Sequence, residues 1–374
     1  MGSLTPYPLA RMETASALAA AGALALIVSI VMMPLVILVA HRRRWFDIPN
    51  ERKIHTDPIP RLGGIGLFFG LLVSSVAVPL VLPALFPDSW PVGYSLRYVT
   101  VLIAICLVHV LGLVDDFHNL RAELKFSLQI AAALLVAFGG FTISVIRIPG
   151  MPVLSLGIFA YPITALWIVT ISNAINLVDG IDGLAGGITG VSALSLGVMC
   201  LIQGQVMPAL IAFSLLGAVL GFLAFNLPPA RIFMGDSGSL LLGFVLAVIP
   251  LMGGTGGTSI VDMLAPATVL LVPIIDTIAA IARRVRARRP IYKPDRDHIH
   301  HKLLALGLKE TSILLLLYGW CAYAGIAASV SLFVLRGKGA VLLAAVWATA
   351  AIAYAVLHAM NQKRKSLPAG LESR

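Results

Sequence analysis

Residues 17–44 decide the fold class, and they read ALAAAGALALIVSIVMMPLVILVAHRRR. A membrane-spanning helix needs about 20 mainly apolar residues, and this run exceeds that length before its first charge at Arg42. The run is too long for the apolar region of a signal peptide, and no small-residue cleavage site separates it from the arginines. We therefore expect an uncleaved membrane helix whose basic end faces the cytoplasm.

The rest of the chain repeats this apolar pattern. Hydrophobic residues make up 59% of the chain and charged residues 12%, which excludes a soluble globular protein. Stretches of near-spanning length lie at 17–40, 62–86, 98–114, 126–146, 155–172, 187–203, 207–225, 239–252, 263–282, 312–335 and 340–360. No internal repeat or long linker divides the chain. We expect one all-α polytopic membrane domain over residues 1–374, with about 11 transmembrane helices.

The basic residues predict the orientation of these helices. Of the 27 lysines and arginines, 22 fall in alternate loops and the C-terminal tail, which by the positive-inside rule face the cytoplasm. We therefore expect the N-terminus outside and the C-terminus inside. We expect the protein to be a multi-pass protein of the inner (plasma) membrane. Topology and anionic lipid headgroups account for the net charge of +10, so nucleic acid is not an expected partner. The predicted cytoplasmic loops lie near 41–61, 115–125, 173–187, 226–238 and 283–311.

Two features outside these loops have structural interpretations. Residues 142–156 form two short alternating runs around Pro149 and Gly150, which predicts a small β-hairpin at the outer surface. The three cysteines, Cys106, Cys200 and Cys321, are scattered one per apolar stretch, which supports neither a disulfide framework nor a zinc site.

Three polar clusters occur where apolar stretches begin or end. Asp115 and Asp116 close the third stretch, residues 173–182 close the fifth, and Asp236 precedes the eighth. The predicted topology puts all three on the cytoplasmic side. Each cluster alone could be a solvated helix end or a helix cap. Ionisable groups at a bilayer boundary are costly, however, so three converging clusters indicate a functional site.

The residue types in these clusters suit phosphate chemistry. Carboxylates with an amide carbonyl form a hard oxygen site for Mg²⁺, which binds through one or two protein carboxylates together with substrate phosphates. Glycines at Gly180 and Gly235 allow close backbone approach to an anion. The loop at 283–302 adds arginines and histidines. Phosphoryl transfer depends on such positioning and charge stabilisation.

A transporter of an anionic solute is the alternative from another functional class. Transporters place acidic and basic groups near the middle of the membrane, often on broken helices related by an internal repeat. Here the clusters fall at helix ends and no repeat is present, which favours an enzyme. A purely structural scaffold would leave the clusters without a purpose.

The ordered motifs resemble the polyprenyl-phosphate N-acetylhexosamine-1-phosphate transferases of glycosyltransferase family 4. They span nearly the whole chain, and they read RKIH at 52–55, PRLGG at 60–64, DDFHN at 115–119, NAINLVDGIDGLA at 173–185, FMGDSGS at 233–239, PIIDT at 273–277 and HIHH at 298–301. The HIHH form resembles the branch that acts on UDP-GlcNAc. The branch that uses UDP-MurNAc-pentapeptide has three consecutive histidines, and it or another UDP-amino sugar is the alternative.

The resemblance implies a reaction between a UDP-amino sugar and undecaprenyl or another polyprenyl phosphate. The lipid phosphate attacks the β-phosphate of the nucleotide sugar, which gives a polyprenyl-diphospho-sugar and UMP and commits the sugar to a cell-envelope glycan. Direct attack and a route through an aspartyl-phosphate are both open. The resemblance leaves open which glycan receives the sugar: O-antigen, teichoic acid or arabinogalactan. It also leaves open whether the protein is a homodimer.

The same resemblance assigns roles to individual residues. Asp236 and Asn176 are implied to hold Mg²⁺, with Mn²⁺ as an alternative ion. Asp115 is implied to deprotonate the lipid phosphate or act as nucleophile, with Asp116 as its catalytic companion and Phe233 stacked on uracil. The nucleotide- and substrate-binding residues are implied to be Lys53, Arg61, Asn173, Asp179, Gly180, Asp182, Phe233, Arg296, His298, His300 and His301.

Overall fold

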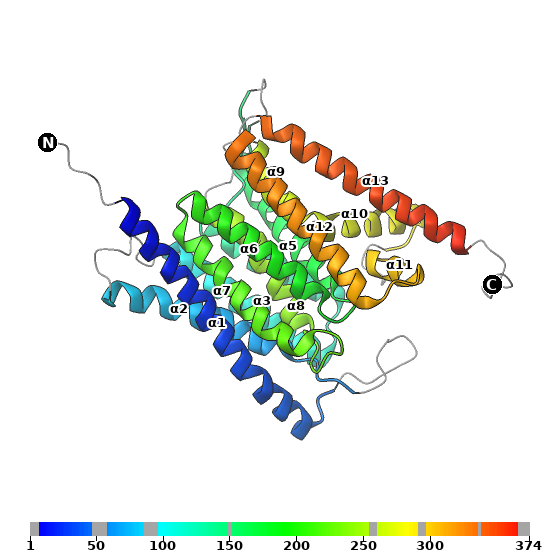
Figure 1. Ribbon diagram of the computed structural model, residues 1–374, viewed down its shortest axis with the longest axis horizontal. Coiled ribbons are helices and arrows are strands. Elements are labelled where there is room, and N and C mark those ends of the chain that lie inside the picture. The colour runs from blue at the N-terminus through cyan, green and yellow to red at the C-terminus, as the bar shows by residue number, and fades with distance from the viewer. Residues whose placement is uncertain are drawn as a thin grey trace.

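The computed structural model describes residues 7–46, 58–85, 96–147, 152–253, 260–290, 297–335 and 338–365, and these form a bundle of helices (Figure 1). Most helices run between the same two ends of the bundle. The helices are α1 (Tyr7–Arg43), α2 (Gly63–Leu85), α3 (Leu96–His118), α4 (Ala122–Phe138), α5 (Ala160–Val178), α6 (Leu184–Ile202), α7 (Val206–Asn226), α8 (Asp236–Met252), α9 (Ile260–Val269), α10 (Leu271–Arg286), α11 (Ile299–Ala305), α12 (Glu310–Val330) and α13 (Gly339–Lys365).

The expected fold class, an all-α polytopic membrane protein, is confirmed. Eight helices of the described chain are long and apolar enough to cross a membrane: α1, α2, α3, α5, α6, α7, α12 and α13. The α8 helix is apolar but shorter. The figure of about 11 spans and the direction in which they cross the membrane stay predictions.

The apolar stretch at 263–282 is divided between two helices that run in different directions (Figure 1). Pro273 has no N–H to donate to the carbonyl of Val269, and Leu270 between the two helices leaves the helical region at φ −96° and ψ 20°. The consequence is that α10 turns away from α9 and carries its basic end, which includes Arg283 and Arg284, toward α11 and α13.

The α8 helix lies at the centre of the bundle, with every residue from Ser237 to Met252 buried. Small residues allow its neighbours to approach closely. A Cβ atom on Gly243 would lie 2.6 Å from Cα of Ser172 in α5, and the Ser172 hydroxyl donates a 2.8 Å hydrogen bond to the carbonyl of Leu240. Close backbone packing through small residues is the usual way in which membrane helices associate.

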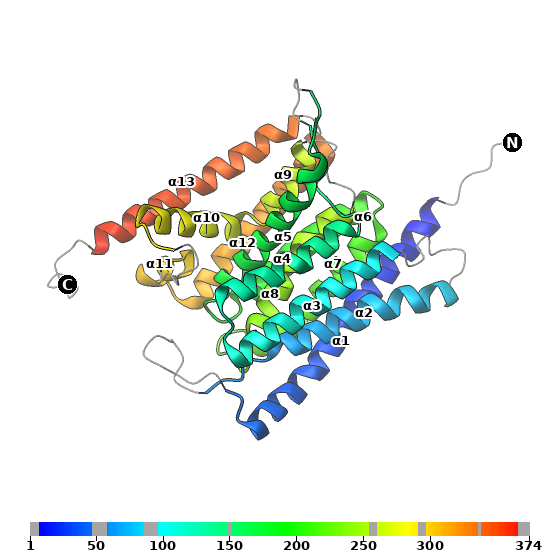
Figure 2. The same cartoon turned by 180° about the vertical axis from the view of Figure 1, so that it is seen from behind.

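The helix directions bring distant parts of the sequence to one end of the bundle. The α3 and α5 helices finish there and α8 begins there, so the three polar clusters of the sequence lie at a common end. The α11 helix and the start of α12 lie on the same side (Figures 1 and 2). The membrane side that this end faces stays a prediction.

The opposite end carries a two-stranded antiparallel sheet of β1 (Val145–Ile146) and β2 (Leu154–Ser155). In its register Val145 faces Ser155 and Ile146 faces Leu154. The turn predicted at Pro149 and Gly150 lies outside the described residues. All three cysteines are free, with Cys200 and Cys321 buried.

Candidate active site

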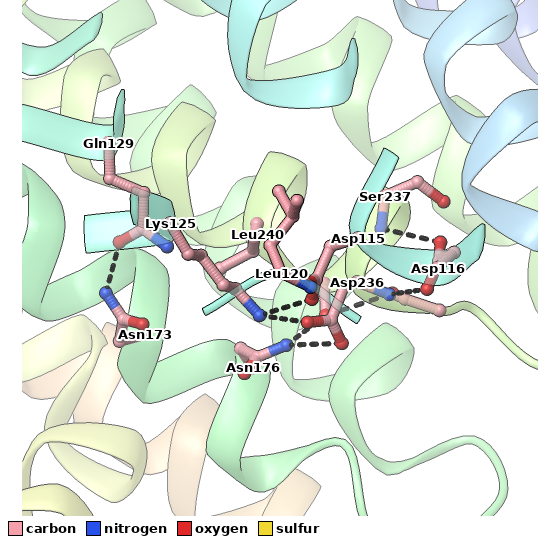
Figure 3. Close-up of polar contacts among 12 residues, drawn as sticks. Asp115, Asp116, Leu120, Lys125, Gln129, Asn173, Asn176, Asp236, Ser237 and Leu240 are labelled. Atoms are coloured by element: carbon pink, nitrogen blue, oxygen red, sulfur yellow. Dashed lines mark hydrogen bonds and ion pairs between the residues drawn. The ribbon is translucent and has the colours of Figure 1, made fainter. Parts of the chain in front are cut away.

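The centre of the site is the Asp236 carboxylate, at the first residue of α8 (Figure 3). Oδ1 of Asp236 lies 3.2 Å from Nη2 of Arg61 and accepts a 3.2 Å hydrogen bond from Nδ2 of Asn176. Oδ2 accepts a hydrogen bond from the ammonium group of Lys125. Groups from α4, α5 and the segment before α2 therefore converge on one carboxylate.

Glycine at position 235 makes this arrangement possible. Gly235 has φ of +71°, and a Cβ atom there would lie 2.5 Å from the carbonyl oxygen of Arg61. The chain on either side is held by backbone pairing, since Phe233 N–H donates to the Pro60 carbonyl at 2.8 Å and Gly63 N–H to the Phe233 carbonyl at 2.9 Å. The two motifs at 60–64 and 233–239 thus form one structural unit, in which Phe233 is half-buried.

Asp116 is the N-terminal cap of α8, although it belongs to α3. Its side chain is 2% exposed, and its two oxygens accept hydrogen bonds from the backbone N–H groups of Asp236 at 2.7 Å and Ser237 at 3.0 Å. A carboxylate at a helix N-terminus satisfies free N–H groups and the helix dipole. Asp116 therefore fixes the position of Asp236, and a direct catalytic role for it stays a prediction.

Lys125 of α4 is the site residue that our sequence reasoning missed, because there it counted only as a positive charge in a loop. Its Nζ atom lies 2.8 Å from Oδ2 of Asp115 and also contacts Asp236 (Figure 3). The three side chains are between 12% and 18% exposed. One cation shared by two partly buried carboxylates offsets their mutual repulsion. Asp115 is further fixed by a 2.7 Å hydrogen bond from the Leu120 N–H.

The carboxylate oxygens around Lys125 are of the kind that a hard divalent ion binds, and a magnesium site here stays a prediction. Asp115 and Asp236 already share a cation, and Asn176 donates from its amide nitrogen Nδ2 to Asp236. Within the described residues no three His, Cys, Asp or Glu side chains are grouped as metal ligands. Mg²⁺ needs fewer than three protein ligands, because it retains water molecules and takes further oxygen ligands from substrate phosphates.

Asn173 and Asp182 do not contact the Asp236 carboxylate. Asn173 donates from Nδ2 to Oε1 of Gln129 at 2.6 Å, which joins α5 to α4 (Figure 3). Asp182 accepts a 2.9 Å hydrogen bond from the Ala230 N–H and so ties the loop after α5 to the loop before α8. Both residues shape the site from outside its centre.

Asp179 follows α5 and lies beside the same charges. Its pKa is raised to about 7, chiefly by desolvation, with Arg61 lowering it and the negative charges of Asp236, Asp116 and Asp182 adding to the rise. This carboxyl group therefore changes its charge close to neutral pH.

The three histidines of 298–301 have different surroundings. His298 is paired through Nδ1 with Oδ2 of Asp276 at 2.8 Å. His300 is 1% exposed and packs on Gly180, where a Cβ atom would overlap its ring. Within the described residues neither ring nitrogen of His300 has a hydrogen-bond partner. Desolvation, reinforced by His301, lowers the pKa of His300 to about 3, so its ring is neutral.

His300 therefore brings two unsatisfied polar atoms to the loop at 179–183. The ring of His301 lies 4.2 Å from that of His300, measured between centroids. The two remaining predicted binding residues, Lys53 and Arg296, lie outside the described residues.

The fold and the site define a helical membrane protein with an ionic centre suited to handling phosphates. Comparison with known proteins agrees, since residues 98–254 match the model of glycosyl transferase family 4. A probable undecaprenyl-phosphate N-acetylglucosaminyl 1-phosphate transferase of Bacillus subtilis is 35% identical over 78% of this chain and 79% of its own. The chain belongs to glycosyl transferase family 4, which confirms the resemblance.

Two further relatives span the chain to a similar extent. A decaprenyl-phosphate N-acetylglucosaminephosphotransferase of Mycobacterium leprae is 37% identical, over 88% of this chain and 87% of its own length. The undecaprenyl-phosphate alpha-N-acetylglucosaminyl 1-phosphate transferase of Escherichia coli K12 is 30% identical, over 75% of this chain and 74% of its own length. All three relatives are named as N-acetylglucosamine phosphate transferases to a polyprenyl phosphate.

Proposed function

We propose that this protein transfers N-acetylglucosamine 1-phosphate from UDP-N-acetylglucosamine to a polyprenyl phosphate and releases UMP. The observation that carries the proposal is the group of Asp115, Lys125, Asp236 and Arg61 at the end of the helix bundle. Fixed cations and oxygen ligands at one point can hold two phosphate-bearing substrates. The names and coverage of the relatives support the donor and the acceptor.

In the proposed reaction an oxygen of the lipid phosphate forms a bond to the β-phosphorus of the nucleotide sugar. The bond from that phosphorus to the bridging oxygen breaks, and UMP leaves with the electron pair. Asp115 is proposed to accept the proton of the acceptor phosphate, and Lys125, which donates to its carboxylate, is proposed to hold it in position. A route through phosphorylated Asp115 uses the same group as nucleophile.

Asp236 and Asn176 are proposed to hold Mg²⁺, with Mn²⁺ as an alternative ion. When bound, such an ion would supply positive charge against the diphosphate. Arg61 also contacts Asp236, so it is proposed to bind the diphosphate beside the ion. Asp179, Asp182, Phe233 and the histidines of α11 are proposed to bind the nucleotide and the sugar.

The location of the reaction is part of the proposal. The excess of basic residues at the site end favours a cytoplasmic position. Nucleotide sugars are charged and soluble, whereas a polyprenyl phosphate lies in the bilayer, and a site at a helix end is accessible to both.

The test is UMP release by the purified protein with undecaprenyl phosphate and Mg²⁺. UDP-GlcNAc, UDP-GalNAc and UDP-MurNAc-pentapeptide are supplied separately, and EDTA is the control for the metal. Release that requires the lipid, stops with EDTA and occurs with UDP-GlcNAc alone is expected. Release with another donor would reassign the sugar, and no release with any donor would overturn the proposed activity.

Asp236→Asn provides the matched loss-of-function variant, since it removes one charge and keeps the shape of the side chain. It should remain folded and lose turnover. Normal turnover in this variant would contradict the assignment of Asp236 to the metal.

A further inference from the structure

The α11 helix, which carries the histidines of the site, cannot hold its position alone. It has seven residues, Ile299–Ala305, and isolated helices shorter than about 12 residues are marginal in water. Its backbone groups must therefore be held by other parts of the protein.

The N-terminus of α11 is held by α10. The carboxylate of Asp276 accepts a 2.9 Å hydrogen bond from the Ile299 N–H and pairs with His298 at 2.8 Å. Two carbonyls of α11, one in its middle and one at its end, are bound by side chains of α13. Asn361 donates from Nδ2 to the carbonyl of Lys302 at 3.0 Å, and Arg364 donates to the carbonyl of Ala305.

A buried lysine joins the middle of α11 to the same helix. Lys302 is 1% exposed, and its Nζ atom donates to the hydroxyl of Tyr354 at 2.6 Å and to the carbonyl of Asp297 at 2.7 Å. Arg283 of α10 donates to the same Tyr354 hydroxyl at 2.8 Å. A buried ammonium is costly unless it is fully partnered, so this contact restricts where α11 can lie.

Tyr354 and Asn361 lie on one stripe of the C-terminal half of α13, most of which is exposed. From position 351 to 364 only Tyr354, Leu357, His358 and Asn361 are not exposed, and their spacing places them on one helix face. The opposite face is apolar, as expected against lipid, with Ile352, Val356 and Met360 more than half exposed.

We propose that α13 is a positioning element for the reaction, and that Tyr354 and Asn361 set the place of His300 against Gly180 by fixing α11. The proposal rests on the proposed function, in which the α11 histidines bind the nucleotide sugar. Neither residue touches the ionic centre at Asp236, so both act through α11. The stretch at 339–365 lies beyond the residues matched by the family model, and its role comes from this structure alone.

The test separates the affinity for the donor from the affinity for the lipid. Tyr354→Phe removes a hydroxyl that accepts from two cations, and loss of one hydrogen bond to a charged group corresponds to about a tenfold change. We expect the KM for UDP-GlcNAc to rise about tenfold, with the KM for undecaprenyl phosphate unchanged. Asn361→Ala should shift the same constant and serves as a second variant, should Tyr354→Phe fail to fold.

Tyr323→Phe is the matched control, because it makes the same chemical change on α12, where the half-exposed ring contacts Trp320. It should leave both KM values unchanged. The coupling between residues is tested with Lys302→Met. In that background Tyr354→Phe should add little, because the hydroxyl of Tyr354 contacts α11 through Lys302, whereas its other partner, Arg283, is on α10.

The outcomes distinguish this inference from the proposed function. If His300→Ala leaves the KM for UDP-GlcNAc unchanged, the assignment of α11 to the donor fails. If His300→Ala raises it while Tyr354→Phe and Asn361→Ala do not, the positioning role of α13 is overturned. A rise in the lipid KM alone would also overturn it, because Tyr354 borders an apolar cleft with Leu303, Trp320 and Leu357 that could hold a lipid chain.

Discussion

Replacement of Lys125 by methionine should strongly disable the site. The change keeps most of the side-chain volume and removes the ammonium group between Asp115 and Asp236. Two carboxylates that are 12% and 14% exposed are then left without their shared cation. Removing one partner of a largely buried ion pair costs about 3 kcal/mol or more.

If the activation free energy rises by this amount, the rate should drop by about two orders of magnitude, because each 1.4 kcal/mol corresponds to a factor of about ten. The assay is lipid-dependent UMP release at saturating substrates, with the thermal unfolding midpoint measured on the same samples. Lys125→Arg keeps the charge but not the shape, so partial activity is expected. Lys338→Met is the control, because Lys338 is exposed and directly precedes α13, a helix that begins at the end of the bundle opposite the site (Figure 1).

Stability provides an independent measure of the same interaction. Lys125→Met should lower the unfolding midpoint, and a second change, Asp115→Asn, should restore part of the loss by removing one of the repelling charges. Wild-type rates in Lys125→Met would refute the view that this cation organises the site. Additive effects of the two changes on stability would refute the ionic explanation.

Three further predictions follow from contacts at the site. Asp116→Ala should lower stability by about 1–2 kcal/mol through loss of the α8 cap, measured by thermal unfolding, and an unchanged midpoint would contradict the capping role. Gly180→Ala should displace His300 and raise the KM for the nucleotide sugar. Gly319→Ala is the control, because there is open space around Gly319, and it should leave this KM unchanged. Equal effects of the two changes would contradict a specific contact between Gly180 and His300. Because the pKa of Asp179 is raised to about 7 in the folded protein, its contribution to stability is fully present below its ordinary pKa near 4 and is lost as pH rises through 7. Asp179→Asn should therefore stabilise the protein more at pH 8 than at pH 5, and the opposite order of midpoints would show that the sign is wrong.

The sequence predicted those features that depend on local composition. Apolar length identified the helices, because hydrophobic burial in a membrane needs a run of defined length whatever its neighbours are. The polar clusters at Asp115, Asn176 and Asp236 were predicted for the same reason, since charge is costly within such runs. The structure brings these three residues to one end of the bundle.

Other features depend on which helices become neighbours. Asn173 was predicted to bind substrate, which stays a prediction, and its side chain pairs with Gln129 across α4 and α5. Asp116 resembled a catalytic residue, and its two oxygens cap α8, a helix that begins 120 positions later in the chain. Neither partner can be identified from spacing along the sequence.

Sequence alone therefore determined the class of protein, the apolar stretches and the family motifs, because hydrophobicity and motif order are properties of the chain itself. Only the tertiary structure decided that Lys125 is shared by two carboxylates and that Tyr354 and Asn361 hold α11. Ion pairs and caps act over about 3 Å, so they exist only after packing has brought distant helices together.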